Sequence, residues 1–283
     1  NKSYKTIQRA IHVANEGDVV EITGVHVGAV KIKKGITLRG TNPETDIILA
    51  ALVPQTAKQR VVFINGEAFP DGQNGATATV TIENLGIQNG VATGNNSGGG
   101  IEVKKMAGTV NLKNLIVKNN MAARAGGGIS LLGSNVNMEG CVVRNNAVTT
   151  EKSSGGGIKV VPSNGTGQDV TVNIRNTHIL YNASVHNGAG LYAWGNNKWG
   201  NNYTLSLNIE NTIIAYNESR TGNGGGAFIK ATTHSKTGEA NVAITIKNMT
   251  MAYNTANGNK YGIFFFNNPT VNMYNTLISQ NGG

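Results

Sequence analysis

The chain of 283 residues is poor in cysteine and has no long apolar run. Cys141 is the only cysteine, so no disulfide framework can form, and its place at an apolar repeat position predicts a buried, unreactive thiol. No stretch approaches the ~20 apolar residues that a membrane-spanning helix needs. We therefore expect no transmembrane span in this chain.

Aspartate is also scarce and occurs only at positions 18, 46, 71 and 169, none of them at a strand position of the repeats. Glycoside hydrolases ordinarily place two carboxyl groups ~5–10 Å apart across the scissile bond, and calcium sites cluster carboxylates. The five histidines show no metal-ligand spacing. The sequence therefore disfavours a hydrolase, and we expect no metal and no cofactor.

Glycine is abundant, with 38 residues in patterned runs. One motif, VNLKNLIVKNN from Val110, recurs with drift from Val80, Val136, Val172, Leu207, Ile244 and Val271. Between most copies a glycine run precedes a short apolar segment; these runs lie at Gly98, Gly126, Gly155, Gly188 and Gly224, with a weaker copy at Tyr261. A constant motif between variable segments indicates a repeat architecture rich in turns.

The spacing of the repeats distinguishes between repeat folds. Positions equivalent to Asn84 follow one another after 30, 26, 36, 35, 37 and 27 residues. Variable turns between constant strands fit the coils of a parallel β-helix, whereas ankyrin and tetratricopeptide arrays have a helical period that is absent here. Apolar residues at helical spacing predict a short helix over residues 6–14, which would cover the open edge of the strands. We predict an all-β parallel β-helix (solenoid) with a short N-terminal capping helix.

We predict a single domain over residues 1–283. Residues 1–22 would form the N-terminal cap and the first strand, residues 23–79 irregular early coils with an insertion, and residues 80–283 the repeated coils. Early strands are expected within 18–22, 29–32, 36–40, 46–51 and 60–64, each bounded by turn residues. The polar start and the closing glycines indicate a trimmed fragment with a truncated C-terminus.

Within a strand, successive side chains point to opposite faces. Val110, Leu112 and their equivalents are apolar, so we predict that they point inward. The asparagines at the two strand ends, equivalent to Asn114 and Asn120, are expected to stack from coil to coil as internal amide ladders. Beside the first ladder, an outward column alternates in charge through Glu83, Lys113, Glu139, Arg175, Glu210 and Lys247. Unlike charges on adjacent strands attract, so we interpret this column as scaffold.

The strand after each glycine run varies most from coil to coil. Its outward positions hold Glu102, Ser130, Lys159, Tyr192, Phe228 and Phe264 and, two residues further on, Lys104, Trp194, Lys230 and Phe266. Aromatic rings stack on sugar faces, and lysines attract acidic groups. We predict that a ligand binds to Lys159, Tyr192, Trp194, Phe228, Lys230, Phe264 and Phe266. The alternative is that turn insertions such as residues 195–202 fold over this strip and bury it.

The formal net charge of +9 favours anionic partners such as acidic glycans. The basic residues are dispersed and form no recognised nucleic-acid module, so we expect no nucleic-acid partner. A polysaccharide lyase needs a cation for the uronate carboxylate, a base and an acid. Lys159, Tyr192 and His186 could supply part of this set, which makes them the catalytic candidates of an alternative, enzymatic hypothesis.

The GGGI runs, paired with strand ends such as LIVKNN and IIAYN, resemble the GGA(I/L/V) and FxxN repeats of chlamydial polymorphic membrane proteins and related surface proteins. More broadly, the chain resembles the right-handed parallel β-helix, or pectin lyase-like, superfamily. Its opening, YKTIQRAIHVANEGDVVEI, is similar to the N-terminal caps of secreted members. The strand-borne aspartates of that superfamily's polygalacturonases and pectinesterases have no match here, but the superfamily also includes lyases that act on acidic polysaccharides through Lys or Arg.

This resemblance implies a bacterial protein that is secreted or displayed at the cell surface, associated with the outer membrane. Together with the residues above, it predicts a glycan-binding or adhesion module whose partner is a polysaccharide, with an acidic one favoured. The alternative is a polysaccharide lyase acting on uronic-acid polymers. The sequence leaves the oligomeric state open.

Overall fold

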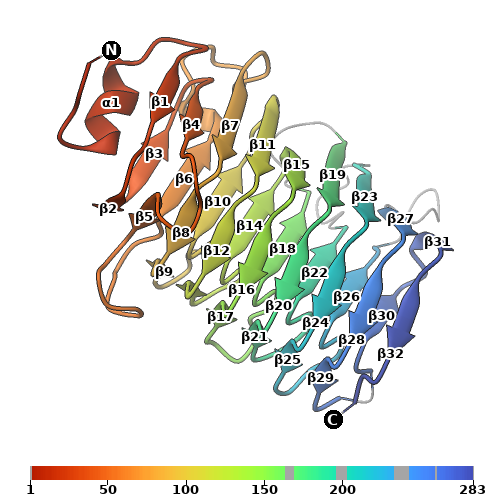
Figure 1. The fold of residues 1–283 in the computed structure, drawn as a ribbon. Coiled ribbons are helices and arrows are strands. Elements are labelled where there is room, and N and C mark those ends of the chain that lie inside the picture. The colour runs from red at the N-terminus through yellow and green to blue at the C-terminus, as the bar shows by residue number, and fades with distance from the viewer. Residues whose placement is uncertain (1, 163–168, 196–202, 233–241, 259, 283) are drawn as a thin grey trace.

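The computed structural model describes residues 2–162, 169–195, 203–232, 242–258 and 260–282. The chain winds into a solenoid whose strands stack side by side along one axis (Figure 1), and all the strand pairs of its sheets are parallel. The predicted fold is confirmed: the protein is a right-handed parallel β-helix with a short N-terminal helix. The right-handed turn is the one that the twist of the strands favours.

The strands of the described residues form four sheets, named A to D, and a complete coil passes through them in the order A, B, D, C. Sheet A contains β1 (Val19–Glu21), β4 (Thr37–Arg39), β7 (Thr79–Glu83), β11 (Thr109–Lys113), β15 (Asn135–Glu139), β19 (Val170–Arg175), β23 (Leu205–Glu210), β27 (Val242–Lys247) and β31 (Thr270–Tyr274). Sheet B contains β2 (Val25–Val27), β5 (Ile47–Leu49), β8 (Gly86–Gln88), β12 (Ile116–Lys118), β16 (Val142–Arg144), β20 (His178–Leu180), β24 (Ile213–Ala215), β28 (Thr250–Ala252) and β32 (Leu277–Ser279).

Sheet C contains β3 (Val30–Ile32), β6 (Val62–Asn65), β10 (Ile101–Lys104), β14 (Ile129–Leu132), β18 (Ile158–Val161), β22 (Leu191–Trp194), β26 (Ala227–Lys230) and β30 (Ile263–Phe266). Sheet D is made of two-residue strands: β9 (Val91–Ala92), β13 (Met121–Ala122), β17 (Ala147–Val148), β21 (Ala183–Ser184), β25 (Glu218–Ser219) and β29 (Thr255–Ala256). The first two coils have no sheet D strand and pass from sheet B directly to sheet C.

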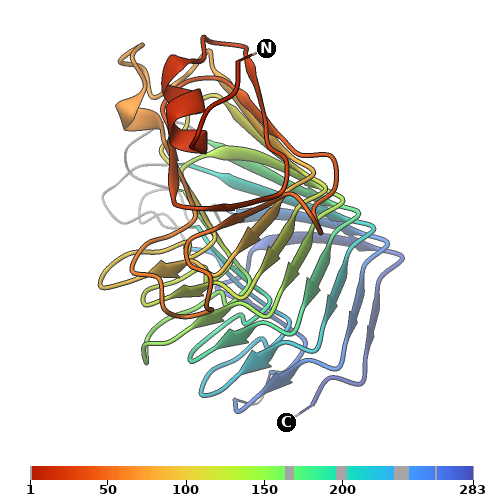
Figure 2. The ribbon, with the colours of Figure 1, turned by 60° about the vertical axis from the view of Figure 1, so that its left-hand side comes forward.

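The predicted capping helix is α1 (Ile7–Val13), which lies over the N-terminal end of the coils (Figure 2). The Thr6 hydroxyl accepts a hydrogen bond from the backbone N–H of Arg9, which satisfies one of the free donors of the first turn. Ile7 and Ile11 are buried against the first coil. The Gln8 side chain also exchanges two hydrogen bonds with the backbone of Lys31, so α1 shields the edge strand β3 as predicted.

The early coils contain the predicted strands, and the insertion carries a short 3-10 helix, η1 (Gly66–Ala68). Sequence analysis missed β2. Val25 and Val27 point away from the core and are each 57% exposed, and only His26 between them points inward. This strand therefore lacks the inward apolar residues that reveal the others. No helix of the described residues is long and apolar enough to cross a membrane.

The core is a stack of aliphatic side chains that repeats from coil to coil. Val110, Leu112, Leu115 and Val117 are all fully buried, as predicted from their alternation. Cys141 lies in the same core, and burial raises the pKa of its thiol to about 11, which confirms the expected inert state.

The second asparagine ladder is internal, as predicted. It consists of Asn120, Asn146, Asn182, Asn217, Asn254 and Asn281. From Asn120 to Asn254, each side-chain amide donates to the Oδ1 of the asparagine in the next coil over 2.8–3.0 Å, and that Oδ1 also accepts from the backbone N–H of the same donor asparagine. The ladder thus satisfies polar groups that would otherwise be buried without partners.

The first asparagine ladder forms on the outside, so the prediction that it is internal was wrong. Asn114 donates to Asn84 over 3.2 Å and Asn248 donates to Asn211 over 3.0 Å, but these side chains are partly or fully exposed. They occupy the corner between sheets A and B with φ between +46° and +56°, a left-handed conformation that asparagine tolerates. This conformation turns the chain and directs the side chain outward; Gly140 takes the equivalent place in one coil with φ +64°.

The column of alternating charge is confirmed by the register of sheet A, which pairs Glu83 with Lys113 and Arg175 with Glu210. Arg39 extends the column by one coil and binds Glu83 over 2.5 Å. Arg175 binds Glu210 over 3.3 Å, and both side chains are well exposed. Exposed pairs contribute little, so the column adjusts the stacking rather than holding the fold.

Candidate functional site

The outer face of sheet C carries the predicted strip in the predicted register. Glu102 pairs with Ser130, Ser130 with Lys159, Lys159 with Tyr192, Tyr192 with Phe228 and Phe228 with Phe264, so these side chains form one row along the axis. The row has two unlike halves. Its N-terminal half lies in a groove, here named the basic groove, and its C-terminal half is an aromatic cluster formed by Tyr192, Phe228, Phe264 and Phe266.

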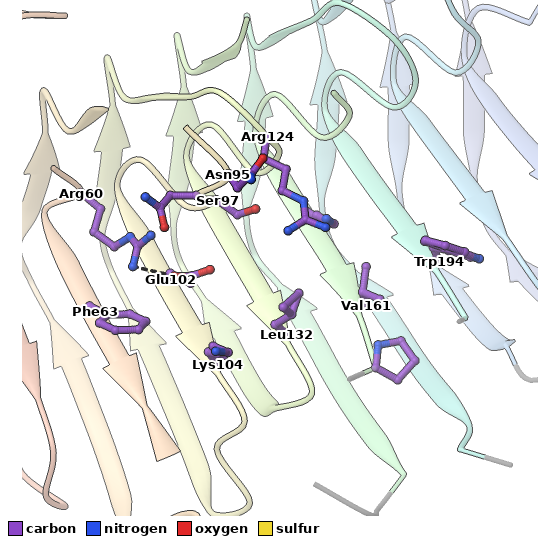
Figure 3. A pocket seen from close by; sticks show the side chains of 13 residues that line it. Arg60, Phe63, Asn95, Ser97, Glu102, Lys104, Arg124, Leu132, Val161 and Trp194 are labelled. Carbon is purple, nitrogen blue, oxygen red and sulfur yellow. Dashed lines mark ion pairs between the residues drawn. The ribbon is translucent and has the colours of Figure 1, made fainter. Parts of the chain in front are cut away.

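The basic groove has a volume of about 480 Å³ and is lined by residues of five consecutive coils. Its floor comes from sheet C, where Phe63 lies on β6 and Trp194 on β22. One wall comes from the turns before the glycine runs, where Arg124 and Ser97 stand. Figure 3 shows Arg124 reaching from this wall above the floor, with Arg60 and Phe63 at one end of the groove and Trp194 at the other.

Arg60 and Glu102 form an ion pair of 2.7 Å at one end of the groove (Figure 3). The pair is largely buried, with 16% and 9% of the two side chains exposed, and the Arg60 guanidinium lies 4.6 Å from the ring centre of Phe63. Burial raises the pKa of Glu102, and the positive charges around it, led by Arg60, offset part of this effect. Glu102 therefore serves chiefly as the partner of Arg60.

Lys104 also has an acidic partner. Its ammonium lies 3.6 Å from the carboxylate of Glu67, which belongs to η1. Lys105 donates a hydrogen bond to the same carboxylate, and this bond is the main reason why the pKa of Glu67 falls below its usual value. Two of the four cations that line the basic groove, Arg60 and Lys104, thus already have a carboxylate partner.

The other two cations, Arg124 and Lys159, form no ion pair among the described residues. Burial and, to a smaller extent, the nearby charge of Arg124 lower the pKa of the Lys159 ammonium to about 8, while Glu102 acts in the opposite direction. Two like charges therefore lie in one groove, and no carboxylate of the described residues forms an ion pair with either of them. Such an arrangement favours the binding of an anion.

Tyr192 lies beside Lys159 on the next strand, as predicted, but its ring is engaged by the aromatic cluster. It stacks on Phe228 with ring centres 5.7 Å apart and an angle of 11° between the planes. Burial raises the pKa of its hydroxyl to about 12. Tyr192 therefore keeps its proton throughout the neutral range.

The aromatic cluster is packed upon itself rather than open. Phe228 stands on the outer face as predicted, yet it is only 6% exposed, since the rings of Phe264 and Phe266 also pack against it at 5.3 and 6.3 Å. Phe266 is 40% exposed. The expectation of an open aromatic platform thus fails at Phe228, because its neighbours in the row cover it.

Lys230 and Trp194 engage each other as well. The Lys230 ammonium lies 5.2 Å from the ring centre of Trp194 and 5.4 Å from that of Phe266, as expected of cation–π contacts. The indole N–H of Trp194 donates to the Thr232 hydroxyl over 3.1 Å. Trp194 is thereby fixed where the basic groove meets the aromatic cluster. Residues 196–202, most of the segment expected to cover the strip, lie outside the described residues.

His186 is not brought to the groove. It lies exposed in the turn that follows β21, where its ring Nδ1 is 2.8 Å from the side-chain nitrogen of Asn187. Of the three catalytic candidates, the structure thus brings together Lys159 and Tyr192 only. No three His, Cys, Asp or Glu side chains of the described part of the chain are grouped so that they could hold a metal ion.

Sequence analysis missed Arg60 and Arg124 as groove residues. Arg60 directly precedes β6 in the irregular early coils, where no repeat assigns its direction. Arg124 stands in a turn, just before the glycine run at Gly126, and its backbone N–H donates to Asn96 of the preceding coil. For Arg124, the usable signal was a charged residue two positions before a glycine run, because all of these runs border the same sheet.

No family model matches the sequence, and no curated protein matches it. Several solved structures are similar in fold. The pectin methylesterase from Yersinia enterocolitica has a TM-score of 0.46 and 12% identity, covering 97% of this chain and 90% of its own. The pectin methylesterase from Erwinia chrysanthemi has a TM-score of 0.47 and 13% identity, covering 98% and 86%. The A-module of a mannuronan C-5 epimerase from Azotobacter vinelandii has a TM-score of 0.34 and 13% identity, covering 97% and 92%.

At these identities the function has to follow from the residues of the groove itself. The groove offers two cations that have no ion-pair partner in the described part of the chain, two cations that have one, and an aromatic ring at each end. Such a surface can bind an extended anion and stack against its less polar parts.

Proposed function

We propose that this protein binds an acidic polysaccharide in the basic groove on the outer face of sheet C. The observation that carries the proposal is the pair of unpaired cations, Arg124 and Lys159, which share one groove. A carboxylate of the ligand would supply the missing counter-charge. Charge-assisted hydrogen bonds of this kind each contribute about 1.5–3 kcal/mol.

The shape of the groove supports a chain-like ligand. The groove crosses the strands from β6 to β22, and neighbouring strands lie about 4.8 Å apart. Phe63 and Trp194 stand at its two ends, where the ring surface that Arg60 and Lys230 leave uncovered would contact sugar faces. A polymer laid along the axis would meet the cations in the middle and an aromatic ring at each end.

The role we propose is that of a binding or adhesion module of a bacterial protein that is secreted or displayed at the cell surface. The resemblance of the glycine-run repeats to those of surface proteins supports this location. Fractionation of the source cells, followed by immunodetection of the protein, would test it. Detection in the cytoplasm alone would contradict it.

Calorimetric titration tests the binding proposal directly. Polygalacturonate serves as the acidic chain and dextran as the neutral one, each at low and at physiological salt. We expect polygalacturonate to bind, its affinity to fall with salt because the contacts are ionic, and dextran not to bind. Arg124→Gln should weaken the binding by roughly tenfold or more.

The matched control is Lys113→Gln, which removes an exposed lysine from the outer face of sheet A. This variant should bind polygalacturonate as the unmodified protein does, since Lys113 lies outside the basic groove. Equal losses in the two variants would show that binding depends on net charge alone. That result would contradict a dedicated groove.

A polysaccharide lyase is the second candidate, and one observation favours it. With a pKa of about 8, Lys159 is in part neutral near neutral pH, so it could remove the proton next to a uronate carboxylate that Arg124 binds. Tyr192, which keeps its proton, could donate to the leaving oxygen. Absorbance of unsaturated products from polygalacturonate measures this reaction, and their absence while the polymer binds would exclude it for this substrate.

A further inference from the structure

Lys159 is held in an unusual way for a lysine on a sheet surface. It lies in register between Ser130 and Tyr192, so neighbours on β14 and β22 flank its side chain on both sides. Ser130 is fully buried and its hydroxyl has no hydrogen-bond partner among the described residues, while Tyr192 is partly buried. The side chain of Lys159 is thus largely removed from water, although it lines the groove.

The positive charge of Arg124 lowers the pKa of Lys159, as burial does, whereas the more distant Glu102 raises it. No carboxylate of the described residues forms an ion pair with Lys159; Glu102, two strands away in the row, binds Arg60 instead. Arg124 places a second positive charge nearby. The groups that face Lys159 are therefore Arg124 and Glu102, with Tyr192 beside it and Lys104 on the same floor. A desolvated lysine next to another cation is the arrangement that makes an amine a nucleophile.

We propose that Lys159 is a nucleophilic lysine that condenses reversibly with the carbonyl carbon of a small 2-oxo acid, whose carboxylate is bound by Arg124. The groove, with about 480 Å³, has ample room for such a molecule. In a 2-oxo acid the carboxylate is bonded directly to the ketone carbon. Arg124 could bind this carboxylate while the amine of Lys159 reaches the ketone carbon. This activity is independent of polysaccharide binding, although it uses the same groove.

The condensation is balanced without an oxidant or a reductant. The neutral Nζ forms a bond to the carbonyl carbon while the C=O π bond breaks, and a proton passes from nitrogen to oxygen. The hydroxyl group of this adduct then takes a proton from solvent and leaves as water. The nitrogen lone pair forms the C=N bond, which gives a protonated imine. At pH 7 the neutral, reactive fraction of an amine with a pKa of about 8 exceeds that of an ordinary lysine by on the order of a hundredfold.

Reductive trapping tests the proposal. The full chain is incubated at pH 7 with pyruvate and cyanoborohydride, and the modified lysines are identified by peptide mass spectrometry. We expect Lys159 to be modified ahead of every other lysine. Lys159→Arg keeps the positive charge and should lower the incorporation summed over the lysine side chains by about tenfold or more, as expected from the reactive fraction; the N-terminal amine is counted separately. Lys113→Arg, on the outer face of sheet A and outside the basic groove, should leave the summed incorporation unchanged.

A neutral carbonyl compound tests the role of Arg124. Arg124→Gln should slow modification by pyruvate several-fold more than modification by propanal. Equal slowing would contradict a carboxylate contact. If modification were spread evenly over the lysines and were unchanged in Lys159→Arg, the proposal that Lys159 is a nucleophile would be wrong. Circular dichroism melting verifies that the variants are folded. The pH profile of Lys159 modification in the unmodified chain, expected to rise to half its maximum near pH 8, gives a test without any variant.

Excess polygalacturonate separates this proposal from the glycan proposal. If the polymer occupies the groove, it should protect Lys159 from pyruvate. If the polymer does not bind, trapping should persist without protection, and only the glycan proposal fails. Binding of the polymer with no selective trapping at Lys159 would reject the nucleophile and leave the glycan proposal intact.

Discussion

The outer faces of sheets A and C are built on the same coils and differ in what changes from one coil to the next. On sheet A, Asn111, Asn137, Asn173 and Asn208 repeat one residue type and bind one another over 2.8–3.0 Å. On sheet C, the row from Glu102 to Phe264 changes its residue at nearly every coil. Where one amide residue repeats, neighbouring side chains form hydrogen bonds with each other. Where the residue type varies, a side chain such as Lys159 has no ion-pair partner among the described residues. The repeated rows therefore hold the coils together, and the varied row is free to bind.

The sharpest test of the repeated rows is Asn182→Ala in the internal ladder. Asn182 binds Asn146, Asn217 and the carbonyl of Val143, and its loss leaves several buried groups unsatisfied. At about 1–3 kcal/mol for each group, the free energy of unfolding should fall by about 4 kcal/mol. Denaturant titration measures the change.

The control for this variant is Asn211→Gly in the exposed ladder. Gly140 occupies the equivalent position, so glycine is compatible with the backbone there. We expect the free energy of unfolding to fall by less than about 1 kcal/mol, because water can replace the lost hydrogen bonds. Similar losses in both variants would show that the internal ladder has no special role.

Phe228→Ala tests whether the C-terminal half of the varied row also belongs to the scaffold. Phe228 is buried by its aromatic neighbours, so its truncation should lower the free energy of unfolding by about 3 kcal/mol. Polygalacturonate affinity of the folded variant should stay within about twofold, because the ring has no free face. If the variant lost its affinity for polygalacturonate while its free energy of unfolding stayed unchanged, Phe228 would instead belong to the binding surface.

The pH dependence of polygalacturonate binding tests whether the N-terminal half of the varied row, which lies in the basic groove, binds the polymer. Lys159 is charged below its pKa of about 8 and neutral above it, so its attraction for a carboxylate is present at low pH and lost as the pH rises through 8. Affinity should fall by roughly tenfold between pH 7 and 9 if one charge-assisted contact is lost. Lys159→Arg should remove this dependence, since a guanidinium stays charged. An unchanged profile in that variant would assign the titration to another group.

The smallest effect is expected for the charged column of sheet A. Arg175 and Glu210 are exposed, so a double-mutant cycle with Arg175→Gln and Glu210→Gln should give a coupling of no more than about 1 kcal/mol. Added salt should reduce it further. A larger coupling would mean that the column does more than adjust the stacking.

Sequence analysis predicted the solenoid because its signals are local and repeated. Inward residues such as Leu112 alternate with polar ones in every copy, and the register follows from aligning the copies. The direction of Asn114 was predicted wrongly, because a left-handed φ of +49° ends the alternation at the corner. Pattern arguments hold only while the backbone stays extended.

The site could be predicted only in part. Lys159 and Tyr192 were found because they stand in repeated strands, where the pleat assigns the outward face. Arg60 and Arg124 lie outside those strands, so no periodicity gave their direction. The burial of Phe228 depends on how several side chains pack on one surface, and the order of residues along the chain does not contain that information directly.

The constant register of sheet C lets the sequence of such a protein evolve at single positions of the row. The copies of the repeat are 26 to 37 residues apart, yet β14, β18 and β22 still pair residue for residue. A longer or shorter turn therefore does not shift the row on the outer face of sheet C. A single substitution in this row alters one position of contact and leaves its neighbours in place, so ligand preference can change one coil at a time without any rearrangement of the chain.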